Sequence, residues 1–111
     1  MESNFRPVED GAALDALLAR SHEKPVLLFK HSNTCPISAR AYRQMQEVGS
    51  PVSIVVVQQS RDISREVESR TGVQHETPQA LVLRNGEAVW SASHFEITAD
   101  AVGQALRNAE G

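Results

Sequence analysis

The sequence predicts a single α/β domain over residues 1–111, with a mixed central sheet and helices on both faces. Three observations lead to this prediction. Short apolar runs alternate with amphipathic helical patterns along most of the chain. Residues 52–57 are almost continuously apolar, which is typical of a strand covered on both faces. Asn85-Gly86 separates two further apolar runs and is the strongest short signal for an antiparallel hairpin.

The first part of the chain predicts strands and helices in alternation. Residues 5–8 are a candidate edge strand, and Asp10 is a suitable N-cap for a helix with the apolar face Ala13, Leu14, Leu17 and Leu18. Residues 26–29 form a short buried strand. A second helix begins at Pro36 and stops at residues 49–51. Its inward stripe is Ile37, Ala41, Met45 and Val48, and its outward residues are Arg40, Arg43 and Gln44.

The second part of the chain completes the sheet. The strand at residues 52–57 should run parallel to the strand at residues 26–29, because a helix connects them by a right-handed crossover. A helix over residues 61–71 ends at Gly72, and Trp90 is expected to pack in the hairpin of residues 81–83 and 88–90. Thr98 caps a last helix with the inward residues Val102, Ala105, Leu106 and Ala109.

The only cysteine of the chain, Cys35, lies between a strand and a helix. Because Pro36 suits the first helical position, Cys35 should be the N-cap, where the helix dipole favours a thiolate. Ser38 shares a helix face with Cys35 and is expected to donate a hydrogen bond to the sulfur. A free cysteine can also be a small buried hydrophobe. The strand, the proline and the helix start favour a reactive thiol here.

Charged residues near Cys35 leave several interpretations open. His31 could hold the thiolate as an imidazolium, or it could be a solvated loop histidine. Lys30 could act similarly, unless it continues the strand and points away. Arg40 and Arg43 could attract carboxylates of a ligand, but a solvated helix face is the better interpretation. No metal site is expected, because the remaining histidines show no metal-ligand spacing: His22, His75 and His94.

Composition excludes several classes of function. The net charge of -3 argues against binding to nucleic acid. No apolar run is long enough to span a membrane, and residues 1–6 do not resemble a signal peptide. One cysteine cannot form an internal disulfide, so we expect a cytoplasmic protein.

Two segments resemble the thioredoxin superfamily. One is Cys35-Pro36-Ile37-Ser38, and the other is the stretch from residue 73 to residue 87, which contains Thr77-Pro78. The resemblance implies a thioredoxin-like fold, with a cis peptide bond before Pro78 and with Pro78 against the thiol. Within the superfamily, the core Thr34-Cys35-Pro36-Ile37-Ser38 resembles the monothiol bacilliredoxins.

This narrower resemblance implies a role for each site residue. Cys35 and Ser38 would be catalytic, and the substrate would contact Thr34, Pro36, Thr77, Pro78 and His31. The implied reaction removes bacillithiol, or a similar low-molecular-weight thiol, from mixed disulfides on client proteins. Bacillithiol would be a co-substrate, and no cofactor would be tightly bound.

Two other functions remain open at this point. The first is a non-catalytic thioredoxin-fold module that binds a partner or a small thiol without turnover. The monothiol glutaredoxins that carry iron–sulfur clusters have Gly-Phe after the cysteine, whereas this chain has Pro36-Ile37. A cluster carrier is therefore the weaker alternative.

Overall fold

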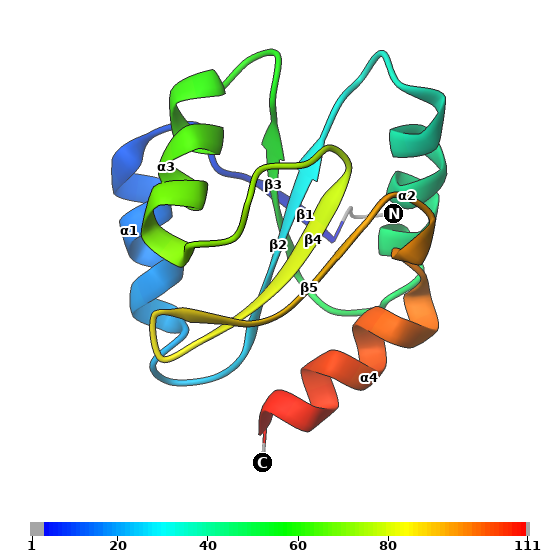
Figure 1. Ribbon diagram of the computed structural model, residues 1–111. Coiled ribbons are helices and arrows are strands. Elements are labelled where there is room, and N and C mark those ends of the chain that lie inside the picture. The colour runs from blue at the N-terminus through cyan, green and yellow to red at the C-terminus, as the bar shows by residue number, and fades with distance from the viewer. Residues whose placement is uncertain (1–3, 111) are drawn as a thin grey trace.

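The central sheet has five strands in the order β1-β3-β2-β4-β5 (Figure 1). The computed structural model describes residues 4–110. The strands are β1 (Phe5–Pro7), β2 (Val26–His31), β3 (Val52–Val56), β4 (Gln79–Arg84) and β5 (Glu87–Ser93). The helices are α1 (Gly11–Arg20), α2 (Pro36–Gln46), α3 (Arg61–Thr71) and α4 (Ala99–Glu110), with a short 3-10 turn η1 (His94–Glu96).

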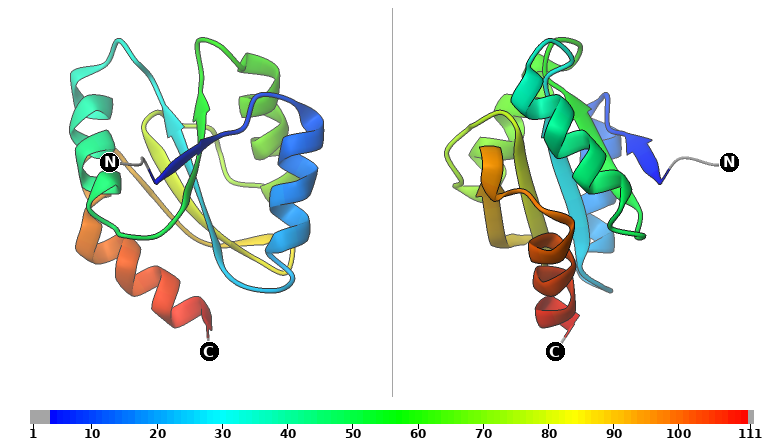
Figure 2. Two further views of the ribbon diagram at one scale, coloured as in Figure 1. Left: turned by 180° about the vertical axis from the view of Figure 1, so that it is seen from behind. Right: turned by 90° about the vertical axis from the view of Figure 1, so that its right-hand side faces the viewer.

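Helices cover both faces of the sheet, as predicted. Helices α1 and α3 lie on one face, and α2 and α4 lie on the other (Figures 1 and 2). No helix in the described part of the chain is long and apolar enough to cross a membrane.

The sheet is mixed, with a parallel half and an antiparallel hairpin. Strands β1 and β2 both pair with β3 in parallel, whereas β4 runs antiparallel to β2 and β5 runs antiparallel to β4. Lys30 near the end of β2 pairs with Gln79 at the start of β4. This register brings the segment before β4, which contains Thr77 and Pro78, to the carboxyl end of β2, where the loop that leads to Cys35 also begins.

Strand β2 is longer than the predicted residues 26–29. Lys30 and His31 continue the ladder, because they pair with Val55 and Val56 of β3. Their polar side chains concealed this from the sequence pattern. Alternation along β2 separates the two residues: His31 shares a face with Phe29, and Lys30 shares the opposite face with Leu28.

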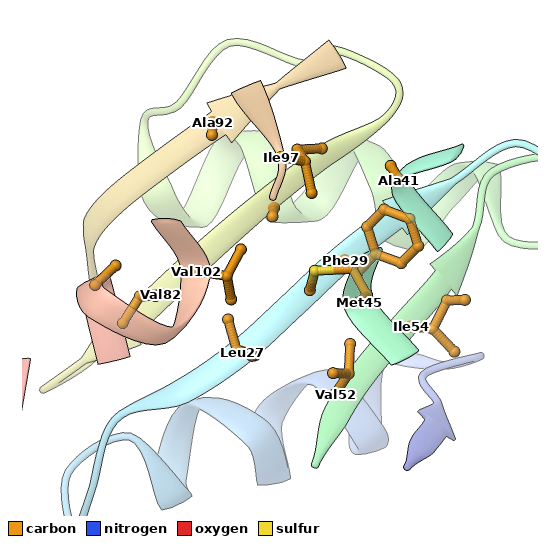
Figure 3. Packing of buried hydrophobic residues seen from close by; sticks show 12 residues of the cluster. Leu27, Phe29, Ala41, Met45, Val52, Ile54, Val82, Ala92, Ile97 and Val102 are labelled. Atoms are coloured by element: carbon orange, nitrogen blue, oxygen red, sulfur yellow. The ribbon is translucent and has the colours of Figure 1, made fainter. Parts of the chain in front are cut away.

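The core consists of two clusters of buried side chains, one on each face of the sheet. On the α2 and α4 side, Met45 and Phe29 are fully buried and lie close together (Figure 3). On the α1 and α3 side, the largest members include Leu14, Leu28 and Leu81. Ile37, which the sequence placed on the inward stripe of α2, is only half-buried, so the core begins one turn later at Ala41.

Several local signals hold as predicted. The carboxylate of Asp10 accepts a hydrogen bond from the backbone N–H of Ala13 at 2.8 Å and caps α1. Gly72 ends α3 in the left-handed conformation, with φ of 73°. Asn85 and Gly86 form the hairpin turn with φ of 56° and 78°. The Thr98 hydroxyl accepts from the backbone N–H of Ala101 at 3.1 Å at the start of α4.

The packing of α2 against the sheet predicts a large effect of Met45→Ala. The substitution leaves a cavity at a fully buried position, and we expect it to lower the free energy of unfolding by about 2–5 kcal/mol. Denaturant unfolding checks this, with Gln46→Ala on the exposed side of the same helix as control. A Met45→Ala protein as stable as the control would contradict the assigned packing.

Candidate active site

Cys35 is the N-cap of α2, as predicted. Its backbone is extended, with φ of -106° and ψ of 123°, and Pro36 opens the helix. The Cys35 carbonyl accepts from the backbone N–H of Ala39 at 3.0 Å. The thiol is half-buried, and it makes no capping hydrogen bond to the helix. The sulfur is therefore reachable and stands at the end of an 11-residue helix that favours negative charge.

Ser38 is fully buried, and its hydroxyl holds the loop before Cys35 in place. The oxygen accepts from the backbone N–H of Ser32 at 2.9 Å and lies 2.7 Å from Nδ1 of His31. Between residues 4 and 110 the structure has no hydrogen bond from Ser38 to the Cys35 sulfur, so that predicted contact was wrong. The hydroxyl points back toward the end of β2, where it is the hydrogen-bond partner of two partly buried polar groups.

His31 lies among aromatic rings. Its ring centroid is 5.5 Å from that of Phe29 and 5.0 Å from that of Tyr42. Burial lowers the pKa of His31 below its ordinary value of 6.5, and the hydrogen bond with Ser38 opposes this shift. This direction favours the neutral imidazole over the imidazolium. The interpretation as a solvated loop histidine is wrong, because His31 ends β2 and lies among aromatic rings.

Gln58, which sequence reasoning missed, ties the β3–α3 loop to the loop before Cys35. Its Nε2 donates to the hydroxyls of Ser32 at 2.7 Å and of Thr34 at 3.1 Å. Its Oε1 accepts from the backbone N–H of Asn33 at 3.3 Å. The only signal in the sequence is topological: Gln58 follows β3, so it lies at the same sheet edge as the loop that follows its parallel neighbour β2.

Lys30 points away from the cysteine helix, as it must if it continues the strand. It is fully buried, and its Nζ lies 3.2 Å from Nδ1 of His75. Burial lowers the pKa of Lys30, and the charge of Glu68 partly opposes the shift. The Nε2 of His75 lies 3.2 Å from the hydroxyl of Thr77. A chain of polar contacts thus connects a buried amine to the residue before Pro78, and His75 was missed as part of the site.

The Thr77–Pro78 peptide bond is cis, as the resemblance implied. Pro78 is buried at the entry to β4, and its carbonyl accepts from the backbone N–H of His94 at 3.1 Å. The η1 turn that follows carries Phe95, whose side chain is 62% exposed. The η1 turn therefore places an exposed aromatic side chain, Phe95, next in the chain to the residue that is hydrogen-bonded to Pro78.

Arg40 is not simply part of a solvated helix face. Its guanidinium lies 5.4 Å from the centre of the Phe95 ring, within the range of a cation–π contact. Its Nη1 is buried without a hydrogen-bond partner among the residues described. Arg43, in contrast, is exposed as predicted, and so are Thr34 and Pro36 beside the cysteine.

Within residues 4–110 we find no group of three or more His, Cys, Asp or Glu side chains arranged to hold a metal ion. The site is built from one thiol, hydroxyls, amides and two histidines. The chemistry available to this set is nucleophilic exchange at sulfur.

The fold and the single accessible thiol define a thiol oxidoreductase of the thioredoxin class. A family model described as monothiol bacilliredoxin BrxC matches residues 6–102, and the chain belongs to this family.

Solved structures agree with the thioredoxin fold. One described as a putative oxidoreductase with a thioredoxin fold is 34% identical, covers 91% of this chain and 92% of its own, and superposes with a TM-score of 0.84. Thioredoxin from Schistosoma mansoni is 17% identical, with a TM-score of 0.73 and coverage of 96% and 98%. Thioredoxin from Trypanosoma brucei brucei is 12% identical, with a TM-score of 0.75 and coverage of 94% and 88%. The last two show the fold alone.

The hydrogen bonds of Ser38 predict that Ser38→Ala destabilises the protein. The substitution leaves the Ser32 N–H and His31 Nδ1 without their partner, which costs about 1–3 kcal/mol for a buried polar group. Urea unfolding measures this, with Ser69→Ala on the exposed side of α3 as control. If Ser38→Ala loses no more stability than the control, the hydroxyl does not hold the loop.

The lowered pKa of His31 predicts a dependence of stability on pH. Between pH 6.5 and the lowered pKa, His31 is protonated in the unfolded chain but stays neutral in the folded protein. The free energy of unfolding therefore falls as the pH falls through this range. We expect His31→Asn to lose less stability between pH 6.5 and the lowered pKa than the wild type loses. His75, whose pKa is also lowered, leaves a residual slope. Parallel profiles of the two proteins would contradict the shift at His31.

Proposed function

We propose that this protein is a monothiol oxidoreductase that removes bacillithiol, or a similar low-molecular-weight thiol, from mixed disulfides on client proteins. The observation that supports it most is the lone, half-buried Cys35 at the N-terminus of α2, at the sheet edge that also carries cis Pro78. Membership in the monothiol bacilliredoxin family names the reaction class. We place the reaction in the cytoplasm, where thiols stay reduced.

The proposed reaction starts with the Cys35 thiolate. The thiolate attacks the sulfur of the small thiol within the mixed disulfide, and a new disulfide forms between Cys35 and the small thiol. The old disulfide breaks, and the client leaves as a thiolate that takes a proton from water. The client is thereby reduced, and Cys35 is oxidised.

Regeneration needs a second small thiol, because the chain has no other cysteine. The second thiol, as a thiolate, attacks the small-thiol sulfur carried on Cys35. The products are a symmetric disulfide of the small thiol and free Cys35 thiolate. A separate reductase must then reduce the symmetric disulfide, since a chain with one cysteine cannot supply both electrons by forming an internal disulfide.

The surroundings of Cys35 suit a protein substrate. Thr34 and Pro36 on either side of the cysteine are exposed, so a client can approach the sulfur. We propose that an extended client segment passes between these residues and the Thr77–Pro78 segment. His31 and Ser38 act indirectly in this scheme, because their hydrogen bonds hold the loop before Cys35.

The test is turnover of a bacillithiolated client in the presence of excess bacillithiol. Wild-type protein should speed release of the client thiol, and Cys35→Ser should abolish the acceleration because it removes the nucleophile. Mass spectrometry of the client follows the loss of the adduct. A client that stays modified while it still binds wild-type protein would instead favour a non-catalytic binding module, and a coloured purified protein would favour a cluster carrier.

A further inference from the structure

A cavity of about 350 Å³ opens beside the cysteine loop. We call it the basic pocket, and its lining residues are Val57, Gln58, Arg61, Ser64, Arg65 and His75. They come from the β3–α3 connection, the first two turns of α3 and the segment before β4. In Figure 1 the β3–α3 loop rises at the same end of the sheet as the β2–α2 loop that carries Cys35.

Gln58 connects the basic pocket directly to the cysteine loop. Its side chain lines the pocket and also donates hydrogen bonds to Ser32 and to Thr34, the residue before Cys35. His75 makes a second connection, because its Nε2 lies 3.2 Å from the hydroxyl of Thr77, next to Pro78. The pocket is therefore connected to the loop before Cys35 through Gln58 and to the Thr77–Pro78 segment through His75.

The pocket rim is cationic although the chain as a whole carries a net charge of -3. Arg61 forms no ion pair within the described residues 4–110. Arg65 faces Asp62 at 3.9 Å, but the two side chains are 78% and 96% exposed, so this pair is weak and easily exchanged. Guanidinium groups bind carboxylates through two parallel hydrogen bonds, which makes both arginines suitable for an anionic ligand.

Polar groups also line the inner side of the pocket. The buried hydroxyl of Ser64 lies 3.2 Å from Nδ1 of His75, and the buried amine of Lys30 lies behind the same nitrogen at 3.2 Å. Glu68 accepts a hydrogen bond from the backbone N–H of His75 at 2.7 Å, and the charges of Glu68 and Glu76 both act on the His75 ring. They reduce the positive charge around His75, but no acidic side chain lines the pocket.

We propose that the small thiol is an anionic one and that the basic pocket binds its carboxylate while its sulfur reacts at Cys35. The inference rests on the proposed function and explains why Cys35 attacks the sulfur of the small thiol and not the sulfur of the client. If Arg61 and Arg65 hold the small-thiol half of a mixed disulfide, that half presents its sulfur to the Cys35 thiolate. The client sulfur is then the leaving group, so the small thiol ends on Cys35.

Arg61 and Arg65 thereby replace Arg40 and Arg43 as the candidates for carboxylate recognition. Arg40 is engaged with the Phe95 ring, and Arg43 is exposed on α2. Neither of them lines the basic pocket.

The test compares two small symmetric disulfides of similar size. The disulfide of mercaptopropionate carries two carboxylates, and the disulfide of mercaptoethanol is neutral. The Cys35 thiolate attacks one sulfur, one mercaptan leaves as its thiolate, and the rate is the appearance of the Cys35 adduct by mass spectrometry. The variant is Arg61→Gln with Arg65→Gln, and wild-type and variant proteins are measured at low and high salt.

A matched control removes the same charge elsewhere. Arg20 and Arg107 line a separate cavity with Val26 and Leu106. Val26 begins β2, whereas Cys35 follows the other end of that strand. The variant Arg20→Gln with Arg107→Gln therefore lowers the net charge equally without touching the basic pocket. It corrects for any general effect of charge on the approach of an anion.

We expect the pocket variant to react about tenfold more slowly than wild type with the anionic disulfide, as expected for lost charge-assisted contacts. Its rate with the neutral disulfide should be unchanged, the control variant should match wild type with both, and high salt should reduce the wild-type preference. Equal slowing with both disulfides, or an equal effect in the control, would overturn the inference. If neither disulfide modifies wild-type Cys35, the proposed function itself fails, and this inference fails with it.

Discussion

The site depends on one buried hydroxyl. Ser38 lies in the first turn of α2, and its oxygen joins that turn to Ser32 and His31 at the end of β2. The hydroxyl is fully buried, and without it the Ser32 N–H and the His31 Nδ1 would both lose a hydrogen-bond partner. Cys35, three residues earlier, is thereby fixed as the N-cap while its sulfur stays free of hydrogen bonds within the described chain. The residue in the position of a second cysteine thus positions the loop.

Parallel pairing of β2 with β3 supplies the rest of the site. It brings the loops after both strands to one edge, where Gln58 crosses from one loop to the other. Antiparallel pairing of β4 with β2 adds the Thr77–Pro78 segment. Alternation along β2 then divides its last residues, so His31 supports the cysteine helix and Lys30 supports His75 on the other face. Three segments distant in sequence therefore meet at the end of the sheet where Cys35 begins α2.

Local rules predicted the elements well, because their causes are local. Pro36 at the first helical position, Gly72 with positive φ and the Asn85-Gly86 turn each act within a few residues. The direction of the Ser38 hydroxyl was predicted wrongly, since helix spacing allows a contact with Cys35 but does not show the competing partners at the end of β2. Gln58 was missed because its partners are 24 to 26 residues away, and the contact of His75 with the buried Lys30 spans 45 residues. Strand register sets both.

The most direct test of the central claim is the product of a single turnover. One equivalent of client carrying bacillithiol is mixed with reduced protein, without free small thiol, and quenched with acid before mass analysis. The account predicts free client thiol and protein with the small thiol on Cys35. A covalent disulfide between the client and Cys35 as the main product would contradict it, because Cys35 would then have attacked the client sulfur.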